Sequence, residues 1–348
     1  MQSIGKERNH MSKLRLKEPR LSVSVSEAHL FGCQILQAAG CPSEAAHKIV
    51  DHLIDAELCG VDSHGFMRVL QYADEMKRGY LKATAVPEVT VEKPTIINVD
   101  GQGGIGILAM ELATRAGIDS AQQNGIAAIA VRNTGHTGRL GAFAEKAAHA
   151  GCLFIACGGG ARDRWRMVAP HGGRKAVLPT NPWCFGIPGG DRGPVVLDCA
   201  TGQIAGGWVY AAKHAGATLP EGTIVDSEGN PTTDPADYIN GGAILPKGGV
   251  LGYGLATIGE LICDAMLGPA MVECNTFMLV VDTAQYRPAG PLQQAAEEIL
   301  TELRDCPPAA GFDRVEVCGE REQARRAGRS ELLLPARTWE AICAAVQS

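Results

Sequence analysis

Between residues 95 and 157, segments with helical periodicity alternate with short runs that are apolar at nearly every position. The spacing predicts helices over 107–124 and 138–150, and strands over 95–100, 126–132 and 153–157. Runs without polar alternation are typical of strands that are covered on both faces. Such a chain has to bury a sheet between helices, so this alternation predicts a mixed α/β protein.

Both ends of the chain are predicted to be helical. Apolar stripes indicate helices over 26–40, 43–60 and from Asp62 or Ser63 to about residue 79, and Pro335 suits the first position of a last helix. The first 21 residues carry six basic and two acidic side chains without an apolar core. We interpret residues 1–21 as a flexible leader rather than a signal peptide.

Length and composition exclude several classes of protein. A chain of 348 residues corresponds to about two or three domains. The net charge of −6 argues against a nucleic-acid or anionic-membrane binder. No apolar run approaches the length of a membrane span. The 12 cysteines contain no C-x-x-C pair, which predicts a cytoplasmic protein with reduced thiols. Because the sequence also lacks H-E-x-x-H and Walker motifs, we expect no metal site.

Gly101, Gly103 and Gly106 spell G-x-G-x-x-G between a predicted strand and a predicted helix. In a chain with 43 glycines, about 0.6 such matches arise by chance. The acidic residue that a Rossmann site needs after the next strand is missing. We therefore interpret the motif as a tight turn, and a Rossmann enzyme with a mainly parallel sheet is the alternative.

The segment from Asp62 to Arg68 contains a histidine and an arginine four residues apart. On one helix, His64 and Arg68 would share a face, where a guanidinium can bind a carboxylate and an imidazole can exchange a proton with the same molecule. A helix N-terminus would lower the pKa of His64. The alternative is a surface pair on an amphipathic helix.

Further polar motifs follow predicted strands or precede helices. His136, in N-T-G-H-T-G, is a second candidate for proton transfer, unless loop carbonyls merely satisfy it. Asp198 ends an apolar strand and is expected to be at least half-buried, so it needs a donor such as a ribose, a histidine or a backbone amide. The glycine-rich segment 245–255 could bind a phosphate at a helix start or form a packed loop.

Together these motifs resemble the malate/L-lactate dehydrogenase family of the non-Rossmann type, which includes ureidoglycolate, sulfolactate and diketogulonate oxidoreductases and cyclic imino acid reductases. The resemblance runs from about residue 22 to 345. It rests on D-S-H-G with Arg68, on N-T-G-H at 133–136, and on T-N-P at 180–182. It rests also on L-D-C-A-T at 197–201, G-N-P-T-T-D-P at 229–235 and G-Y-G-L at 252–255.

The resemblance implies an α/β (α+β) fold with a mostly antiparallel sheet. It implies a helical domain from both chain ends (22–80 and 305–348), a cofactor-binding domain (81–152 and 236–304) and an inserted smaller domain (153–235). It also implies a homodimer with the active site near the subunit interface.

The resemblance further implies an NAD(P)-dependent oxidoreductase that moves a hydride between nicotinamide and C2 of a small 2-hydroxy or 2-oxo carboxylic acid. His64 would be the proton donor or acceptor, and Arg68 with Ser63 would bind the substrate. His136 would be a second acid/base or would contact nicotinamide. The implied cofactor-binding residues are Gly160, Thr180, Asn181, Asp198, Cys199, Ala200, Val250, Leu251, Gly319 and Glu320.

Three positions depart from the family pattern. Leu251 and Trp208 replace lysines that are usual in the family, and Gly160 replaces a common serine or threonine. The positive charge of the two missing lysines could be supplied by one of the arginines at 162, 164, 166 and 174, or by Lys175. The choice between NAD and NADP stays open. The alternatives are an NADPH-dependent reductase of cyclic imino acids and a binding protein that has lost hydride transfer.

Overall fold

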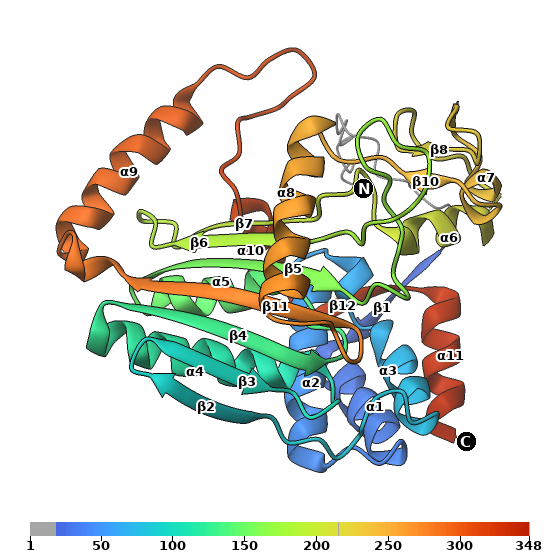
Figure 1. Cartoon of the computed structure of the whole chain (residues 1–348), viewed down its shortest axis with the longest axis horizontal. Coiled ribbons are helices and arrows are strands. Elements are labelled where there is room, and N and C mark those ends of the chain that lie inside the picture. Colours follow the sequence, from blue (N-terminus) through green and yellow to red (C-terminus); the bar gives the residue numbers. More distant parts are fainter. Residues whose placement is uncertain (1–18, 215, 348) are drawn as a thin grey trace, which may run out of the picture.

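The structure is a computed structural model that describes residues 19–214 and 216–347. A seven-stranded sheet forms its centre, and helices from both chain ends pack together beside one end of that sheet (Figure 1). A second, three-stranded sheet lies in a smaller unit next to these helices. The expected mixed α/β fold is confirmed.

The large sheet is mostly antiparallel, as expected from the sequence. β3 and β4 pair in parallel, while every other neighbouring pair in this sheet is antiparallel. The mainly parallel sheet of a Rossmann enzyme is thereby excluded. In sheet order the strands are β2 (Glu88–Lys93), β3 (Ile96–Asp100), β4 (Ile126–Thr134), β11 (Cys274–Asp282), β5 (Cys152–Gly160), β6 (Trp183–Ile187) and β7 (Val195–Cys199).

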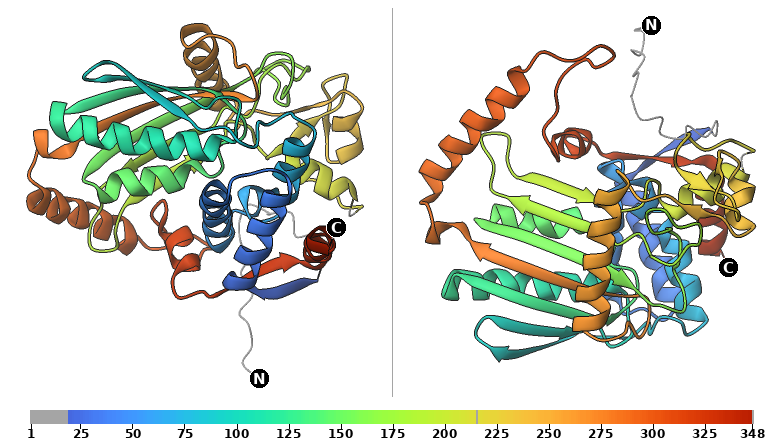
Figure 2. Two further views of the ribbon diagram at one scale, coloured as in Figure 1. Left: turned by 90° about the horizontal axis from the view of Figure 1, so that it is seen from below. Right: turned by 45° about the horizontal axis from the view of Figure 1, so that its top comes forward.

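Helices cover the two faces of this sheet unequally. α4 (Gly106–Asn124) and α5 (Leu140–His149) pack along one face, and α8 (Val250–Glu260) with its π-helical continuation η2 (Leu261–Met266) stands on the other (Figure 2). The apolar strands are buried mainly against α4 and α5. The largest fully buried side chains of this core include Ile97, Met110, Ile129, Phe143 and Phe154. No helix in the described ranges is long and apolar enough to cross a membrane.

The helical part combines both chain ends. The helices are α1 (Val25–Ala38), α2 (Ser43–Leu58), α3 (Arg68–Lys77) and α11 (Ala336–Gln347). A short sheet of β1 (Arg20–Ser24) and β12 (Glu331–Pro335) ties the two ends together.

Two boundary predictions are corrected by this sheet. The leader predicted over 1–21 lies mostly outside the described residues, but Arg20 and Leu21 already belong to β1. Pro335 ends β12 instead of starting the last helix. Both errors arise because β1 and β12 stabilise each other although they lie near opposite ends of the sequence. A local sequence pattern does not reveal such a long-range pairing.

The smaller unit has its own small core. Its elements are α6 (Gly206–His214), α7 (Pro235–Ile239), β8 (Ile224–Val225), β9 (Pro231–Thr232) and β10 (Ala243–Ile244). Val168, Val209, Leu219, Ile224 and Ile244 are buried together between them. The predicted unit of residues 153–235 contains β5, β6 and β7, which pair instead within the large sheet. It also ends before most of α7 and before β10, which belong to the smaller unit. Subject to these differences, we keep the division into domains as a proposal.

The remaining helices connect the sheet to the C-terminal segment. They are the 3-10 turn η3 (Thr283–Gln285), α9 (Ala289–Asp305) and α10 (Glu320–Arg326). Arg326 of α10 forms ion pairs with Asp55 of α2 and Glu145 of α5, at 2.6 and 2.8 Å. Arg139 joins the same two carboxylates, at 2.7 and 3.1 Å. This network fixes the C-terminal segment against both the helical part and the sheet.

The G-x-G-x-x-G segment forms a tight turn between β3 and α4. Gly103 has a φ of +76°, and a Cβ on Gly106 would lie 2.5 Å from the carbonyl oxygen of Gly135. The Gly106 amide donates to the His136 carbonyl at 3.0 Å. The glycines therefore allow the turn to pack against the loop that carries His136.

Candidate active site

The predicted helix that starts at Asp62 is interrupted. Asp62–His64 form the 3-10 turn η1, Gly65 is extended, and α3 begins only at Arg68. The Glu57 carboxylate of α2 accepts the Phe66 amide proton at 2.9 Å. A Cβ on Gly65 would lie 2.0 Å from that carboxylate. The buried Glu57 therefore stabilises the break, and the argument that His64 and Arg68 share one helical face is wrong.

His64 and Arg68 nevertheless remain close neighbours. Arg68 Nε donates to the Ser63 carbonyl oxygen at 2.7 Å, and Ser63 Oγ lies 2.9 Å from His64 Nδ1. Burial, followed by the charge of Arg68, lowers the pKa of His64 to about 4. The predicted direction of the shift holds, although its main cause is desolvation rather than a helix terminus.

His136 brings a second imidazole to the same place. Its ring centroid lies 5.0 Å from that of His64. Tyr72 Oη lies 2.6 Å from His136 Nδ1, and the Gly138 amide donates to the same nitrogen at 3.3 Å. Burial, followed by the charge of Arg68, holds the pKa of His136 well below its usual value. Because Nδ1 accepts hydrogen bonds, we assign the proton of the neutral ring to Nε2.

Two buried carboxyl groups lie behind this cluster, and sequence reasoning missed both. Gln71 accepts from Arg68 Nη1 and donates to Glu75 Oε1 at 2.8 Å. The His136 backbone amide donates to the Glu273 carboxyl group. Burial and the charge of Glu75 raise the pKa of Glu273 to about 7. In the sequence, Glu75 looks like any polar position on an amphipathic helix, and Glu273 lies in a turn before a strand.

Two of the predicted cofactor-binding residues, Gly160 and Asn181, meet at the carboxylate of Glu260, and Thr180 precedes Asn181 in the chain. The Gly160 amide donates to Glu260 Oε1 at 3.3 Å, and Asn181 Nδ2 donates to the same oxygen at 2.8 Å. The Thr180 carbonyl accepts two hydrogen bonds from Thr201, at 2.8 and 2.9 Å. Asn181 is fully buried, and its Oδ1 has no partner among the described residues. This oxygen is free to accept a hydrogen bond from a ligand.

The predicted residues of β7 lie beside the C-terminal segment. Asp198 Oδ2 accepts the Gly141 amide proton at 2.7 Å, so a backbone amide supplies the donor that the sequence argument required. The residue as a whole is exposed, but the protein around its carboxyl group raises the pKa of Asp198 by desolvation, so the expected burial holds for the carboxyl group only. Cys199 and Ala200 follow it and are half-buried. Burial raises the pKa of the Cys199 thiol, and the charge of Lys247 acts in the opposite direction.

The last four predicted residues fall on two helix starts. Gly319 caps α10 beside β7, where the Val196 amide donates to the Cys318 carbonyl at 3.2 Å. Glu320 forms ion pairs with Arg304 and Arg192, at 2.8 and 3.5 Å. Val250 and Leu251 form the first turn of α8 and are 65% and 70% exposed.

Carboxylates already pair with all four arginines proposed to compensate for the missing lysines. Arg166 contacts Glu260 at 3.0 Å, and the other three arginines pair with Asp264, Asp163 and Glu228. Lys175 is exposed. Lys247 is exposed as well, and its backbone amide donates to the Thr201 carbonyl at 2.7 Å. Lys247 therefore lies beside the segment that follows Cys199 and Ala200, whereas Arg166 lies beside Gly160 and Asn181 but is paired with Glu260 there.

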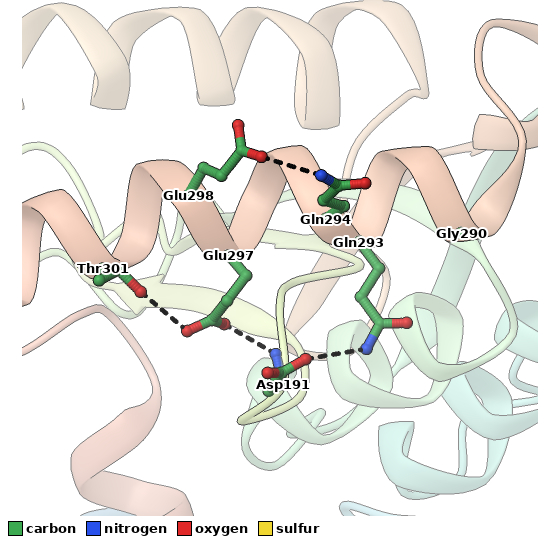
Figure 3. Close-up of a pocket in the computed structure, with 7 residues that line it drawn as sticks. All are labelled: Asp191, Gly290, Gln293, Gln294, Glu297, Glu298 and Thr301. Atoms are coloured by element: carbon green, nitrogen blue, oxygen red, sulfur yellow. Dashed lines mark hydrogen bonds between the residues drawn. The ribbon is translucent and has the colours of Figure 1, made fainter.

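A separate pocket lies between α9 and the loop at Asp191 (Figure 3). Glu297 accepts the Asp191 amide proton at 2.8 Å and the Thr301 hydroxyl proton at 3.0 Å there. None of the residues that line this pocket belongs to the predicted site, so the pocket and the histidine cluster are different places.

The fold and the cluster together define a mixed α/β protein outside the Rossmann class, with two neutral imidazoles beside a guanidinium. The chain belongs to the malate/L-lactate dehydrogenase family, whose profile matches residues 23–343. The family's activity is that of an oxidoreductase.

Individual relatives cover nearly the whole chain. An L-lactate dehydrogenase of Cupriavidus necator is 32% identical over 327 residues, which are 90% of this chain and 93% of the relative. A Delta(1)-pyrroline-2-carboxylate/Delta(1)-piperideine-2-carboxylate reductase of Pseudomonas putida is 34% identical over 67% of each chain. The solved structure of sulfolactate dehydrogenase from Methanocaldococcus jannaschii superposes with a TM-score of 0.83 at 27% identity, covering 94% of this chain and 98% of that one.

Proposed function

We propose that the protein is an NAD(P)-dependent oxidoreductase that transfers a hydride between nicotinamide and C2 of a small 2-hydroxy or 2-oxo carboxylic acid. The observation that carries the proposal is the meeting of His64 and Arg68 with His136, which comes from a segment far away in the chain. Family membership supports the reaction class.

In this proposal Arg68 binds the substrate carboxylate. Nε and one N–H of Nη1 orient the guanidinium through Ser63 and Gln71, which leaves further N–H groups for two parallel hydrogen bonds to an acid. Ser63 also holds the ring of His64 through its hydroxyl group. The acid would thus be held at a fixed orientation relative to the imidazole.

His64 then exchanges the proton of the substrate oxygen. With a pKa of about 4 the free ring is neutral near pH 7, so it can accept the hydroxyl proton when a hydroxy acid is oxidised. A bound carboxylate would raise the pKa of the ring, because a nearby anion favours the imidazolium needed in the reverse direction. His136, with its proton on Nε2, would donate a hydrogen bond to the substrate or the nicotinamide.

The bound nicotinamide would donate or accept the hydride. The residues proposed to hold the cofactor are those around Glu260 and β7, and the partnerless Oδ1 of Asn181 suits the amide group of a nicotinamide. The start of α8 and Lys247 could bind the phosphates. With Leu251 and Trp208 in place of lysines, both NAD and NADP remain candidates.

A reductase of cyclic imino acids is the second candidate. The relative from Pseudomonas putida favours it, and such a substrate would use the same carboxylate clamp and the same hydride. A matrix of NADH and NADPH against 2-oxo acids and cyclic imino acids, followed at the dihydronicotinamide absorbance, separates the two. Fluorescence titration with NADH and NADPH tests the alternative of a binding protein that has lost hydride transfer, which predicts no binding of either cofactor.

The homodimer and the cytoplasmic location also remain proposals. Ile258, Leu261 and Met266, on α8 and η2, are 50–59% exposed, and clustered exposed apolar side chains are typical of protein interfaces. Sedimentation of the wild type and of Leu261→Asp tests this surface, because a dimer formed through it should dissociate in the variant.

Two substitutions test the assigned roles. We expect Arg68→Ala to raise KM for the acid strongly, and His64→Ala to lower kcat by about 100-fold or more. Arg78→Ala, at an exposed ion pair with Asp74 in the same helix region, is the control and should leave both constants unchanged. Near wild-type turnover of His64→Ala on a good substrate would refute the proton-transfer role.

A further inference from the structure

Two pairs of metal-ligating side chains face each other across the first two helices. α1 carries His29 and Cys33, and α2 carries His47 and Asp51. Each pair is spaced four residues apart, so its two side chains project from one face of their helix. The helices pack against each other along their length and are joined by a short turn. Four potential ligands therefore converge in the helical part of the fold.

The separations within the group resemble those of a tetrahedral metal site. Cys33 Sγ lies 3.6 Å from His47 Nδ1 and 3.9 Å from His29 Nδ1. One ligand atom from each of these three residues lies within 4.8 Å of the other two. Bond lengths typical of zinc imply about 3.6 Å between a nitrogen and the sulfur, and about 3.3 Å between two nitrogens. To bind one ion, the His29 ring has to turn so that Nδ1 points toward Cys33, and the exposed His47 has to move closer to His29.

Asp51 occupies the position of a supporting group. Its Oδ1 lies 3.1 Å from His29 Nε2, while Cys33 Sγ lies almost equally far from both nitrogens of that ring, 3.9 Å from Nδ1 and 4.0 Å from Nε2. A carboxylate that accepts the second ring proton is the usual partner of a metal-bound histidine, since it fixes the tautomer and the ring orientation. The group therefore contains a supporting carboxylate as well as three ligands.

The exposure of the group suits an ion that enters from solvent. Cys33 is 5% exposed, His29 is half-buried and His47 is exposed. The thiol would bind the ion from the buried side of the site, and the two imidazoles would bind it from the sides nearer to solvent. A fourth position would stay open to water. Mixed imidazole and thiolate ligands favour zinc-type ions over magnesium or calcium.

We propose that His29, Cys33 and His47 form a binding site for a divalent transition metal of the zinc type, with Asp51 orienting His29. As Cys33 coordinates the ion, its thiol proton passes to solvent. The ion would join α1 to α2, which also carries the Glu57 carboxylate under the His64 turn. The site reverses the expectation of no metal, and it is independent of the proposed hydride transfer.

Titration of the reduced, tag-free full-length protein with Co²⁺ and then Zn²⁺ tests the proposal. We expect one Co²⁺ per chain with a thiolate-to-cobalt charge-transfer band, displaced by Zn²⁺, and a rise in Tm with Zn²⁺. Cys33→Ala should abolish the band, and His47→Ala should weaken binding at least tenfold. Asp51→Asn should weaken binding by about 10–100-fold.

Matched controls separate this group from other thiols and imidazoles. Cys306 and His149 are exposed residues outside the group, so Cys306→Ala and His149→Ala should bind as the wild type does. His47 is exposed, so His47→Ala is expected to fold even if Cys33→Ala does not. The proposal is overturned if the wild type shows no charge-transfer band at micromolar Co²⁺, or if the band persists in Cys33→Ala or at full strength in His47→Ala.

Discussion

Replacing Tyr72 by phenylalanine isolates the hydrogen bond that orients His136. Tyr72 is fully buried, and burial raises its pKa far above the assay range, so the hydroxyl group keeps its proton and donates to His136 Nδ1 at 2.6 Å. Phenylalanine keeps the ring packing and removes only this donor. Nδ1 would then retain the Gly138 amide alone, at 3.3 Å.

Loss of this hydrogen bond should affect both the stability of the protein and its kcat/KM. Losing a buried hydrogen bond to an imidazole should lower the free energy of unfolding by about 1–2 kcal/mol. If the proton on Nε2 of His136 is used in the reaction, a comparable loss in the transition state would lower kcat/KM by about 5–30-fold. The lower kcat/KM would arise because more of the His136 rings carry their proton on Nδ1 instead of Nε2.

Urea unfolding and steady-state kinetics measure the two effects separately. Tyr80→Phe is the control, because Tyr80 Oη donates only a longer hydrogen bond, at 3.3 Å, to the Val272 carbonyl. If Tyr72→Phe loses stability but keeps its kcat/KM, the assigned tautomer plays no part in turnover. If it loses neither, the hydrogen bond itself is refuted.

Two further predictions concern stability. Gly65→Ala places a Cβ 2.0 Å from the Glu57 carboxylate and should lower the free energy of unfolding, measured in urea, by about 1–3 kcal/mol. The control is Gly290→Ala, which has open space around it and should leave the stability unchanged. Equal stabilities of the two variants would contradict the tight contact at Gly65. Because the pKa of Glu273 is raised to about 7, its protonated form favours the fold, and that stability is present below about pH 4.5 and lost as pH rises through 7. The free energy of unfolding of Glu273→Gln should therefore depend less on pH over this range. Above pH 7 the variant should be more stable than wild type by up to about 3 kcal/mol. If the free energies of unfolding of the two proteins change with pH in parallel, Glu273 ionises normally.

Much of the fold could be predicted because its signals are local. The apolar run over 126–132 becomes β4, and the stripe over 107–124 becomes α4 almost residue for residue. The break at Gly65 could not be predicted, because helical periodicity continues through it. It depends on a carboxylate from α2, and a sequence pattern does not contain the position of a neighbouring helix.

The candidate site divides in the same way. His64, Arg68 and His136 were identified because their residue types suit acid and proton chemistry. Tyr72 and Glu273 were missed because nothing in their neighbours along the chain marks them as parts of a site. Only the packing of α3 and the turn before β11 against the His136 loop gives them contact with it.

The sequence by itself determined the alternation of helices and strands, the helical chain ends and the residues that carry the family resemblance, since each depends on contacts within a few positions. The tertiary structure decided the pairing of β1 with β12, the neutral state of the two imidazoles and the approach of His29 and Cys33 to His47. Those features arise from groups far apart in the chain, and only the packing of the core removes water from them and sets the distances between them.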